Sequence, residues 1–135
     1  FPTRRSSDLA CFNDEFVRNH TNQRQIGKGM MLTNFDRTLA PNRALIRRIK
    51  DTANTLHKPL QLDMFNGGGT DGGEAHKSRD GKPTAVSCLP VRYGHCAYSI
   101  AHLQDIADAI DIFTELIVNF DEAAYRASIN FLKGV

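Results

Sequence analysis

The sequence predicts an α/β fold with helices on both faces of a β-sheet. Segments of strand character alternate along the chain with segments of helical character, which is typical of βαβ units. The strand segments are 30–35, 60–65 and 84–89, and the helical segments are 42–58, 71–79, 102–120 and 121–132. The 135 residues, 41% hydrophobic and 24% charged, suit one globular domain with a real core. Because sheets hold about 5–6 strands on average, three strands indicate an incomplete sheet.

The first half of the chain is expected to contain an irregular segment, a strand and a helix. Residues 10–28 are polar and are predicted to form a loop, followed by the strand at 30–35. Asn42 is a suitable N-cap for the first helix. Leu45, Ile46, Ile49, Ala53 and Leu56 recur at helical spacing. The helix should end before Pro59, because the residue preceding a proline disfavours the αR conformation.

The second half is expected to follow the same alternation. After the strand at 60–65 and a glycine-rich loop, Asp71 could cap a short helix. A turn at 80–83 leads to the strand at 84–89 and a loop at 92–99. The helix at 102–120 has an apolar stripe of 3.6-residue period, predicted to face the core. Its members are Leu103, Ile106, Ala109, Ile110, Phe113, Leu116, Ile117 and Phe120.

Charge and composition exclude several classes of function. The net charge of +2 is too small, and the basic residues too scattered, to indicate nucleic-acid binding. No segment reaches the roughly 18 consecutive apolar residues that a membrane span needs. Cys11, Cys88 and Cys96 form no CxxC pattern. Reduced thiols in a cytoplasmic protein are therefore the simpler interpretation.

Two polar loops are the candidate functional segments. One is Gly67-Gly-Gly-Thr-Asp-Gly-Gly-Glu-Ala-His76, which follows a strand, and the other is Arg92-Tyr-Gly-His95, which follows the next strand. Loops at the ends of strands commonly build the sites of open α/β sheets, so we expect the two to lie together. Taken singly, three glycines could be a mobile turn and a loop histidine could be a surface residue. The glycine spacing does not fit a phosphate-binding P-loop.

Four motifs together resemble the M42 family of metallo-aminopeptidases. The glycine segment is similar to the family's GGGTDAGAIH, and Arg92-Tyr-Gly-His95 is similar to its RYIH. Gly27-Lys28-Gly29, followed by Asp36-Arg37, resembles LGKG and its Asp-Arg pair, and Pro41-Asn42-Arg43 resembles the family's helix start. The motifs occur in the family's order between about residues 26 and 118. The resemblance implies the C-terminal part of a three-layer α/β/α zinc-peptidase catalytic domain.

The resemblance also implies roles for individual residues. His95 would be a ligand of one of two divalent ions, zinc or cobalt, in the full-length parent. The residues implied to line the substrate pocket are Gly67, Gly68, Gly69, Thr70, Asp71, Arg92 and Tyr93. His76 would have a structural role, and Cys96 stands where the family usually has serine. The full-length parent would hydrolyse N-terminal residues from peptides and form homo-oligomers. Differences from the family pattern at Gly72, Glu74, Gly94 and Cys96 leave its substrate preference open.

The N-terminus is expected to be foreign to the protein. Residues 1–9, Phe-Pro-Thr-Arg-Arg-Ser-Ser-Asp-Leu, match the translation of a sequencing adapter. Residues 10–135 would then be the C-terminal part of the peptidase domain, with the other metal ligands and the general base upstream. The chain alone is expected to be inactive. The alternative is an inactive peptidase homologue, a small-molecule-binding or structural α/β module. A carbohydrate hydrolase is less favoured, because no suitable pair of carboxylates is found.

Overall fold

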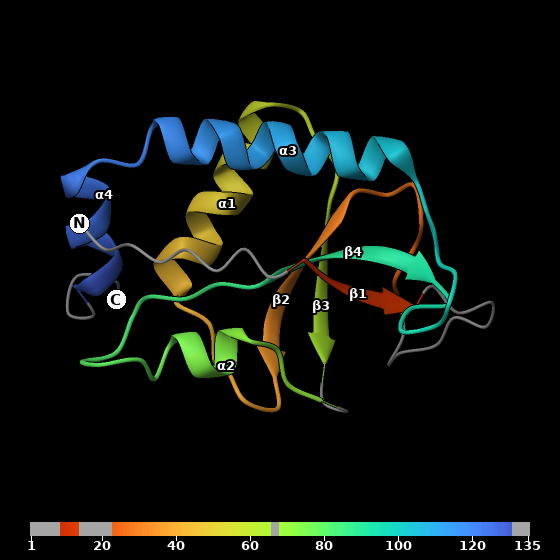
Figure 1. Ribbon diagram of the computed structural model, residues 1–135. Coiled ribbons are helices and arrows are strands. Elements are labelled where there is room, and N and C mark those ends of the chain that lie inside the picture. Colours follow the sequence, from red (N-terminus) through yellow and green to blue (C-terminus); the bar gives the residue numbers. More distant parts are fainter. Residues whose placement is uncertain (1–8, 14–22, 66–67, 131–135) are drawn as a thin grey trace.

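The computed structural model describes residues 9–13, 23–65 and 68–130 (Figure 1). In chain order the elements are β1 (Leu9–Asn13), β2 (Met30–Asp36), α1 (Arg43–Thr55), β3 (Leu60–Phe65), α2 (Gly72–Ala75), β4 (Ser87–Arg92), β5 (Ile100–Ala101), α3 (Leu103–Val118) and α4 (Glu122–Ile129). All seven predicted elements are present, although α2 is shorter and β4 lies about three residues later than predicted. The prediction of a loop for 10–28 is wrong at its start, where β1 forms, and β5 was not predicted.

The sheet is mixed, with the strand order β1-β4-β2-β3 and β5 paired to β4. β1 runs parallel to β4, and β2 runs parallel to β3. β4 is antiparallel to both β2 and β5. The segment β2–α1–β3 is therefore a βαβ unit as predicted, whereas the connection from β3 through α2 to β4 reverses the chain direction. Within the described ranges, β1 and β3 stand at the two ends of this strand order.

One face of the sheet carries the main core. Because side chains alternate between the faces of a strand, β2 and β4 each present every second residue to this face. The buried residues of this cluster are Met30, Leu32, Ile49, Ala53, Leu89, Val91, Ala109, Ile112 and Leu116. They come from β2, α1, β4 and α3, and Figure 1 shows both helices on this side of the sheet.

The opposite face carries a smaller core and a thinner cover. Met31 and Cys88 point to this side and pack with Leu39 and Val86. α2 contacts the cluster closely: a Cβ on Gly72 would lie 2.4 Å from a methyl carbon of Val86. Figure 1 shows α2 on the side of the sheet away from α3. The predicted arrangement of helices on both faces is thus present in the described part, although one face has only a single turn of helix.

The buried face of α3 differs from the predicted stripe. Leu103, Ile110 and Ile117 are 81%, 60% and 55% exposed. The buried residues of the helix are Asp105, Asp108, Ala109, Ile112 and Leu116. Apolar residues occur around most of this helix, so periodicity alone could not select the face, and two carboxylates with specific partners lie on the buried side.

Asp108 connects α3 to the end of α1. Its carboxylate lies 2.9 Å from the Lys58 ammonium, which also lies 2.8 Å from the carboxylate of Asp111. The Lys58 ammonium has the largest effect on Asp108 and lowers its pKa, and a hydrogen bond from Gln104 lowers it further. Burial acts in the opposite direction but is outweighed, so the pKa of Asp108 lies below its ordinary value. The two carboxylates raise the pKa of Lys58 to about 12. These ion pairs help to fix the orientation of α3, which its apolar pattern does not determine.

None of the helices in the described ranges is both long enough and apolar enough to cross a membrane.

Candidate functional site

Asp36, at the end of β2, organises the glycine loop. Its side chain is buried, and one carboxylate oxygen accepts hydrogen bonds from the backbone N–H and the hydroxyl of Thr38, at 2.7 and 2.8 Å. The other oxygen accepts a hydrogen bond from the Thr70 hydroxyl at 2.6 Å. The next residue, Arg37, donates its backbone N–H to the Gly68 carbonyl at 3.0 Å. Asp36 therefore links the end of β2 to the loop that follows β3.

These hydrogen bonds determine the charge state of Asp36. Burial by itself would raise the pKa of the carboxyl group, because it disfavours the ionised form. Hydrogen bonds from Thr70, Thr38 and Leu39 together outweigh burial and hold the pKa below its ordinary value of 3.8. Asp36 is thus an ionised, fully engaged acceptor at neutral pH. A carboxylate in this state serves to position its donors.

The small residues of the glycine segment are needed for close packing. A Cβ on Gly69 would lie 2.4 Å from the Thr38 methyl carbon, and a Cβ on Gly73 would lie 2.1 Å from the Thr38 hydroxyl oxygen. Real Cβ atoms do not approach so closely, so larger residues would displace Thr38 from Asp36. Gly67 lies outside the described residues.

The two polar residues on either side of α2 differ in how far they agree with the predictions. Asp71 is the N-cap residue by position, but its side chain makes no capping hydrogen bond, so that expected role is wrong. His76 is half-buried, and its Nδ1 lies 3.2 Å from the Gly72 carbonyl oxygen. This contact agrees with the structural role predicted for His76.

The second candidate loop connects β4 to β5. Arg92 is the last residue of β4 and pairs with Ile100 of β5. Tyr93 and His95 both have left-handed backbone conformations, with φ of 61° and 62°, and the backbone N–H of Cys96 donates to the Tyr93 carbonyl at 3.2 Å. Non-glycine residues adopt this conformation rarely, and histidine does so more readily than most. The resulting tight turn leaves His95 exposed and accessible.

The two loops do not lie together, contrary to expectation. β3 is parallel to β2 and β4 is antiparallel to it, so β3 and β4 run in opposite directions. Their carboxyl ends, and the loops that follow them, therefore lie at opposite ends of the sheet (Figure 1). The carboxyl end that does accompany the His95 loop is that of β1, because Asn13 pairs with Val91 in the parallel ladder.

Asp105 supports the turn that precedes β2, a role the sequence did not reveal. Its buried carboxylate accepts the backbone N–H of Gly27 at 2.7 Å and that of Gly29 at 2.8 Å. His102, at the start of α3, lies against Gly27: a Cβ there would be 3.5 Å from the imidazole ring. A buried aspartate between apolar residues of one helical face was the available signal, but the predicted face excluded it.

The described residues do not form a metal centre by themselves. No group of three or more histidine, cysteine, aspartate or glutamate side chains is suitably placed in ranges 9–13, 23–65 and 68–130. His95 is exposed and has a free approach, but one imidazole is not enough to hold two ions.

The comparison with protein families identifies the chain's relatives. The family model described as M42 glutamyl aminopeptidase matches residues 6–112. The chain belongs to this M42 family. It is 37% identical over 71 residues to an Escherichia coli (strain K12) protein named "Putative aminopeptidase FrvX", a match covering 53% of this chain and 20% of that protein.

Solved structures show the same fold in longer proteins. A TET aminopeptidase from a marine-sediment Thaumarchaeota archaeon matches with a TM-score of 0.81 and 31% identity, over 90% of this chain and 36% of that one. The Pyrococcus horikoshii TET1 peptidase, described as assembling into a tetrahedron or a large octahedral shell, matches with a TM-score of 0.66 and 22% identity, over 78% and 30%. At that identity the second likeness shows the fold alone. The chain spans about a fifth to a third of these relatives.

Proposed function

We propose that this M42 chain is the C-terminal part of a dinuclear metal-dependent aminopeptidase, which removes N-terminal residues from peptides. The family match over residues 6–112 is the observation that carries this proposal. The proposed role of His95 is that of a metal ligand. The exposed imidazole on the β4–β5 turn and the carboxyl end of β1 on the same edge support that role.

The metal site needs residues beyond those described. In a dinuclear peptidase two divalent ions, zinc or cobalt in this proposal, activate a water molecule and polarise the scissile carbonyl. His95 could donate one imidazole nitrogen, and Arg92 and Tyr93 would flank the pocket from the same turn. The remaining ligands and the general base would come from elsewhere in the complete protein. No catalytic step follows from the present residues alone, so we propose that the chain by itself is inactive.

The proposed pocket is best restricted to the β4–β5 turn. Gly68, Gly69, Thr70 and Asp71 follow β3 at the other end of the sheet, and the described contacts of this segment include Asp36, Arg37 and Thr38; Gly67 lies outside the described residues. Its role in lining the pocket stays a prediction. We further propose that the complete protein is a cytoplasmic homo-oligomer; the assemblies named for the Pyrococcus horikoshii relative support the oligomer.

A matched pair of histidine variants tests the role of His95. In the complete protein, His95→Asn should reduce the bound metal from about two ions per chain to about one, and most aminopeptidase activity should be lost. Asparagine tolerates the left-handed backbone conformation but is a poor zinc ligand, so the turn should survive the change. Metal content can be measured by atomic emission after dialysis, together with release of amino acids from aminoacyl substrates.

His57→Asn is the control, because His57 is also exposed and has a φ of 53°. It should keep both metal ions and full activity. If the His95→Asn protein retained both ions, His95 would not be a ligand. If the complete protein bound two metals and released no amino acid from any substrate, the peptidase proposal itself would fail. For the present chain, calorimetry should show no tight stoichiometric zinc binding.

A further inference from the structure

β3 forms an outer edge of the described sheet, and among the described strands only one of its two sides is paired. Across the described ranges it pairs only with β2, and β1 lies at the other side of the sheet. Leu62 and Met64 are 46% and 66% exposed on this strand. They share a face with Leu60, which packs against the main core, so they lie on the side of the sheet that α1 covers. An unpaired strand edge of this kind is a template for an added strand.

A row of positive charge lies along α1, on the side of the helix that lines a pocket with Asn34 and Phe35 of β2. Arg43, Arg47 and Lys50 are exposed on α1 at positions i, i+4 and i+7, which places them along one side of the helix. None of the three has a carboxylate within ion-pair distance in the described part of the chain. Arg43, Arg47 and Lys50, here called the basic row, therefore have no ion-pair partner among the described residues. Asp51 is the acidic residue that lines the same pocket.

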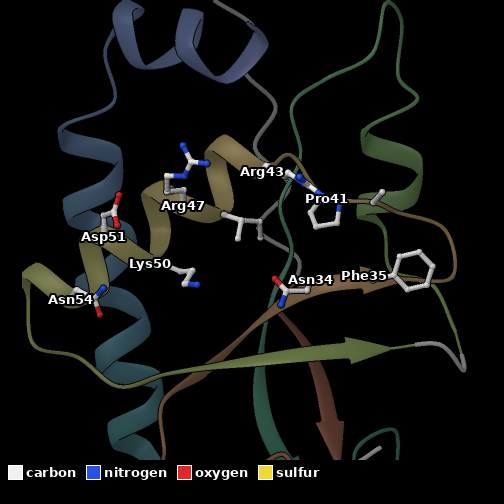
Figure 2. A pocket seen from close by; sticks show the side chains of 10 residues that line it. Asn34, Phe35, Pro41, Arg43, Arg47, Lys50, Asp51 and Asn54 are labelled. Atoms are coloured by element: carbon white, nitrogen blue, oxygen red, sulfur yellow. The ribbon is translucent and has the colours of Figure 1, made fainter. Parts of the chain in front are cut away.

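The basic row borders an open pocket between α1 and the strands (Figure 2). The pocket has a volume of about 640 Å³. Its lining residues are Asn34, Phe35, Ala40, Pro41, Arg43, Ile46, Arg47, Lys50, Asp51 and Asn54. Figure 2 shows Lys50 and Asn34 facing the space between the helix and the sheet. Phe35 is 47% exposed and pairs with Met64 in the β2–β3 ladder, so the apolar part of the pocket continues onto the strand edge.

We propose that the β3 edge and the basic row of α1 form a docking site for an extended acidic peptide. The peptide would pair its backbone with β3, as in other cases of strand addition. Arg43 and Arg47 are about 6 Å apart along the helix axis, given a rise of about 1.5 Å per residue. Side chains on one side of an extended strand repeat every ~6.6 Å. Glutamates at alternate peptide positions would thus match the spacing of the cations.

Charge favours this occupant over a second copy of the chain. Two β3 edges paired about a two-fold axis would place two basic rows near each other, and like charges oppose that arrangement. An acidic strand instead neutralises the row, while the stems of its glutamates can contact Leu62 and Met64. The site lies at the other side of the sheet from the β1–β4 edge that carries His95. It is thus separate from the proposed metal pocket and does not depend on peptidase activity.

Binding of labelled peptides to the present chain tests the site. The probe is a nine-residue peptide with glutamate at alternate positions and threonine between them, followed by fluorescence anisotropy at low salt. We expect it to bind at least about tenfold more tightly than the same peptide with glutamine, and to weaken as salt screens the charges. Arg47→Glu with Lys50→Glu should raise the dissociation constant at least about tenfold.

Lys77→Glu with Lys82→Glu is the control for net charge, because both lysines are exposed and belong to neither β3 nor α1. It should change the dissociation constant less than about twofold. Two N-methylated peptides, blocked at the even or the odd positions, test backbone pairing: one register should lose binding and the other keep it.

Three results would overturn the proposal. If the control variant weakened peptide binding as much as Arg47→Glu with Lys50→Glu does, the binding would depend on net charge alone and not on the basic row. Undiminished binding of both N-methylated peptides would exclude strand addition. A dimer that Leu62→Glu with Met64→Glu dissociates, in a chain that binds no acidic peptide, would make a second copy the occupant of the edge.

Discussion

Gly29→Ala is expected to lower the free energy of unfolding by about 2–5 kcal/mol, a large part of the stability of a marginally stable chain. Gly29 has a φ of +85°, a conformation that costs an alanine roughly 1–2 kcal/mol. The added Cβ would also lie 2.0 Å from the carbonyl oxygen of Pro59 and 2.5 Å from its carbonyl carbon. Backbone atoms cannot rotate away as a side chain can, so the start of β3 would have to move, at a further cost of about 1–3 kcal/mol.

Gly81→Ala separates the two contributions. Gly81 has a φ of +83°, but a Cβ there would meet only the His76 carbonyl oxygen, at an ordinary 3.6 Å. Its loss of stability should be close to the conformational cost alone, about 1–2 kcal/mol. Urea denaturation followed by circular dichroism measures both variants. Equal losses would show that the contact with Pro59 relaxes, and that only the left-handed conformation of Gly29 matters.

The local features of the fold were readable from the sequence. Asn42 was expected to cap α1, and its side-chain oxygen accepts the Leu45 N–H at 3.0 Å. Ile49 and Ala53 were expected on the core face and are buried. Both predictions depend on residues within one or two turns of each other. The glycine motif at 27–29 was likewise recognisable, and its purpose is now explained by the close approach of Pro59.

The long-range features were not readable, for two physical reasons. The direction of a strand depends on the end of the sheet at which the preceding connection arrives. The amino-acid compositions of α2 and β4 do not specify that end. The two candidate loops were therefore placed together, although β3 and β4 run in opposite directions. Several partners of buried carboxylates are also distant in sequence. Asp105 binds the turn at Gly27, 78 positions away, and its place among apolar residues of α3 does not identify that partner.

Asp36 links the end of β2 to the glycine loop, so its substitution should cause the second large loss of stability. Asp36→Asn should lower the free energy of unfolding at pH 7 by about 2–3 kcal/mol, because an amide nitrogen replaces one charged acceptor and faces a hydroxyl or amide donor. Asp80→Asn, in an exposed turn, should change it by less than about 0.5 kcal/mol and controls for the loss of a surface charge.

The pH dependence of this difference identifies its cause. The folded-state pKa of Asp36 is below the ordinary value of 3.8, so the ionised carboxylate contributes its full stability above pH 3.8. That contribution is lost as the pH falls from 3.8 through the lower folded-state pKa, where the folded chain must take up the proton. The difference in free energy of unfolding between the original chain and Asp36→Asn should therefore be constant near neutral pH and shrink below pH 3.8. Denaturation series at several pH values measure it. A gap that stayed constant into acid would mean that shape, and not the charge of Asp36, holds Thr38 and Thr70 in the glycine loop.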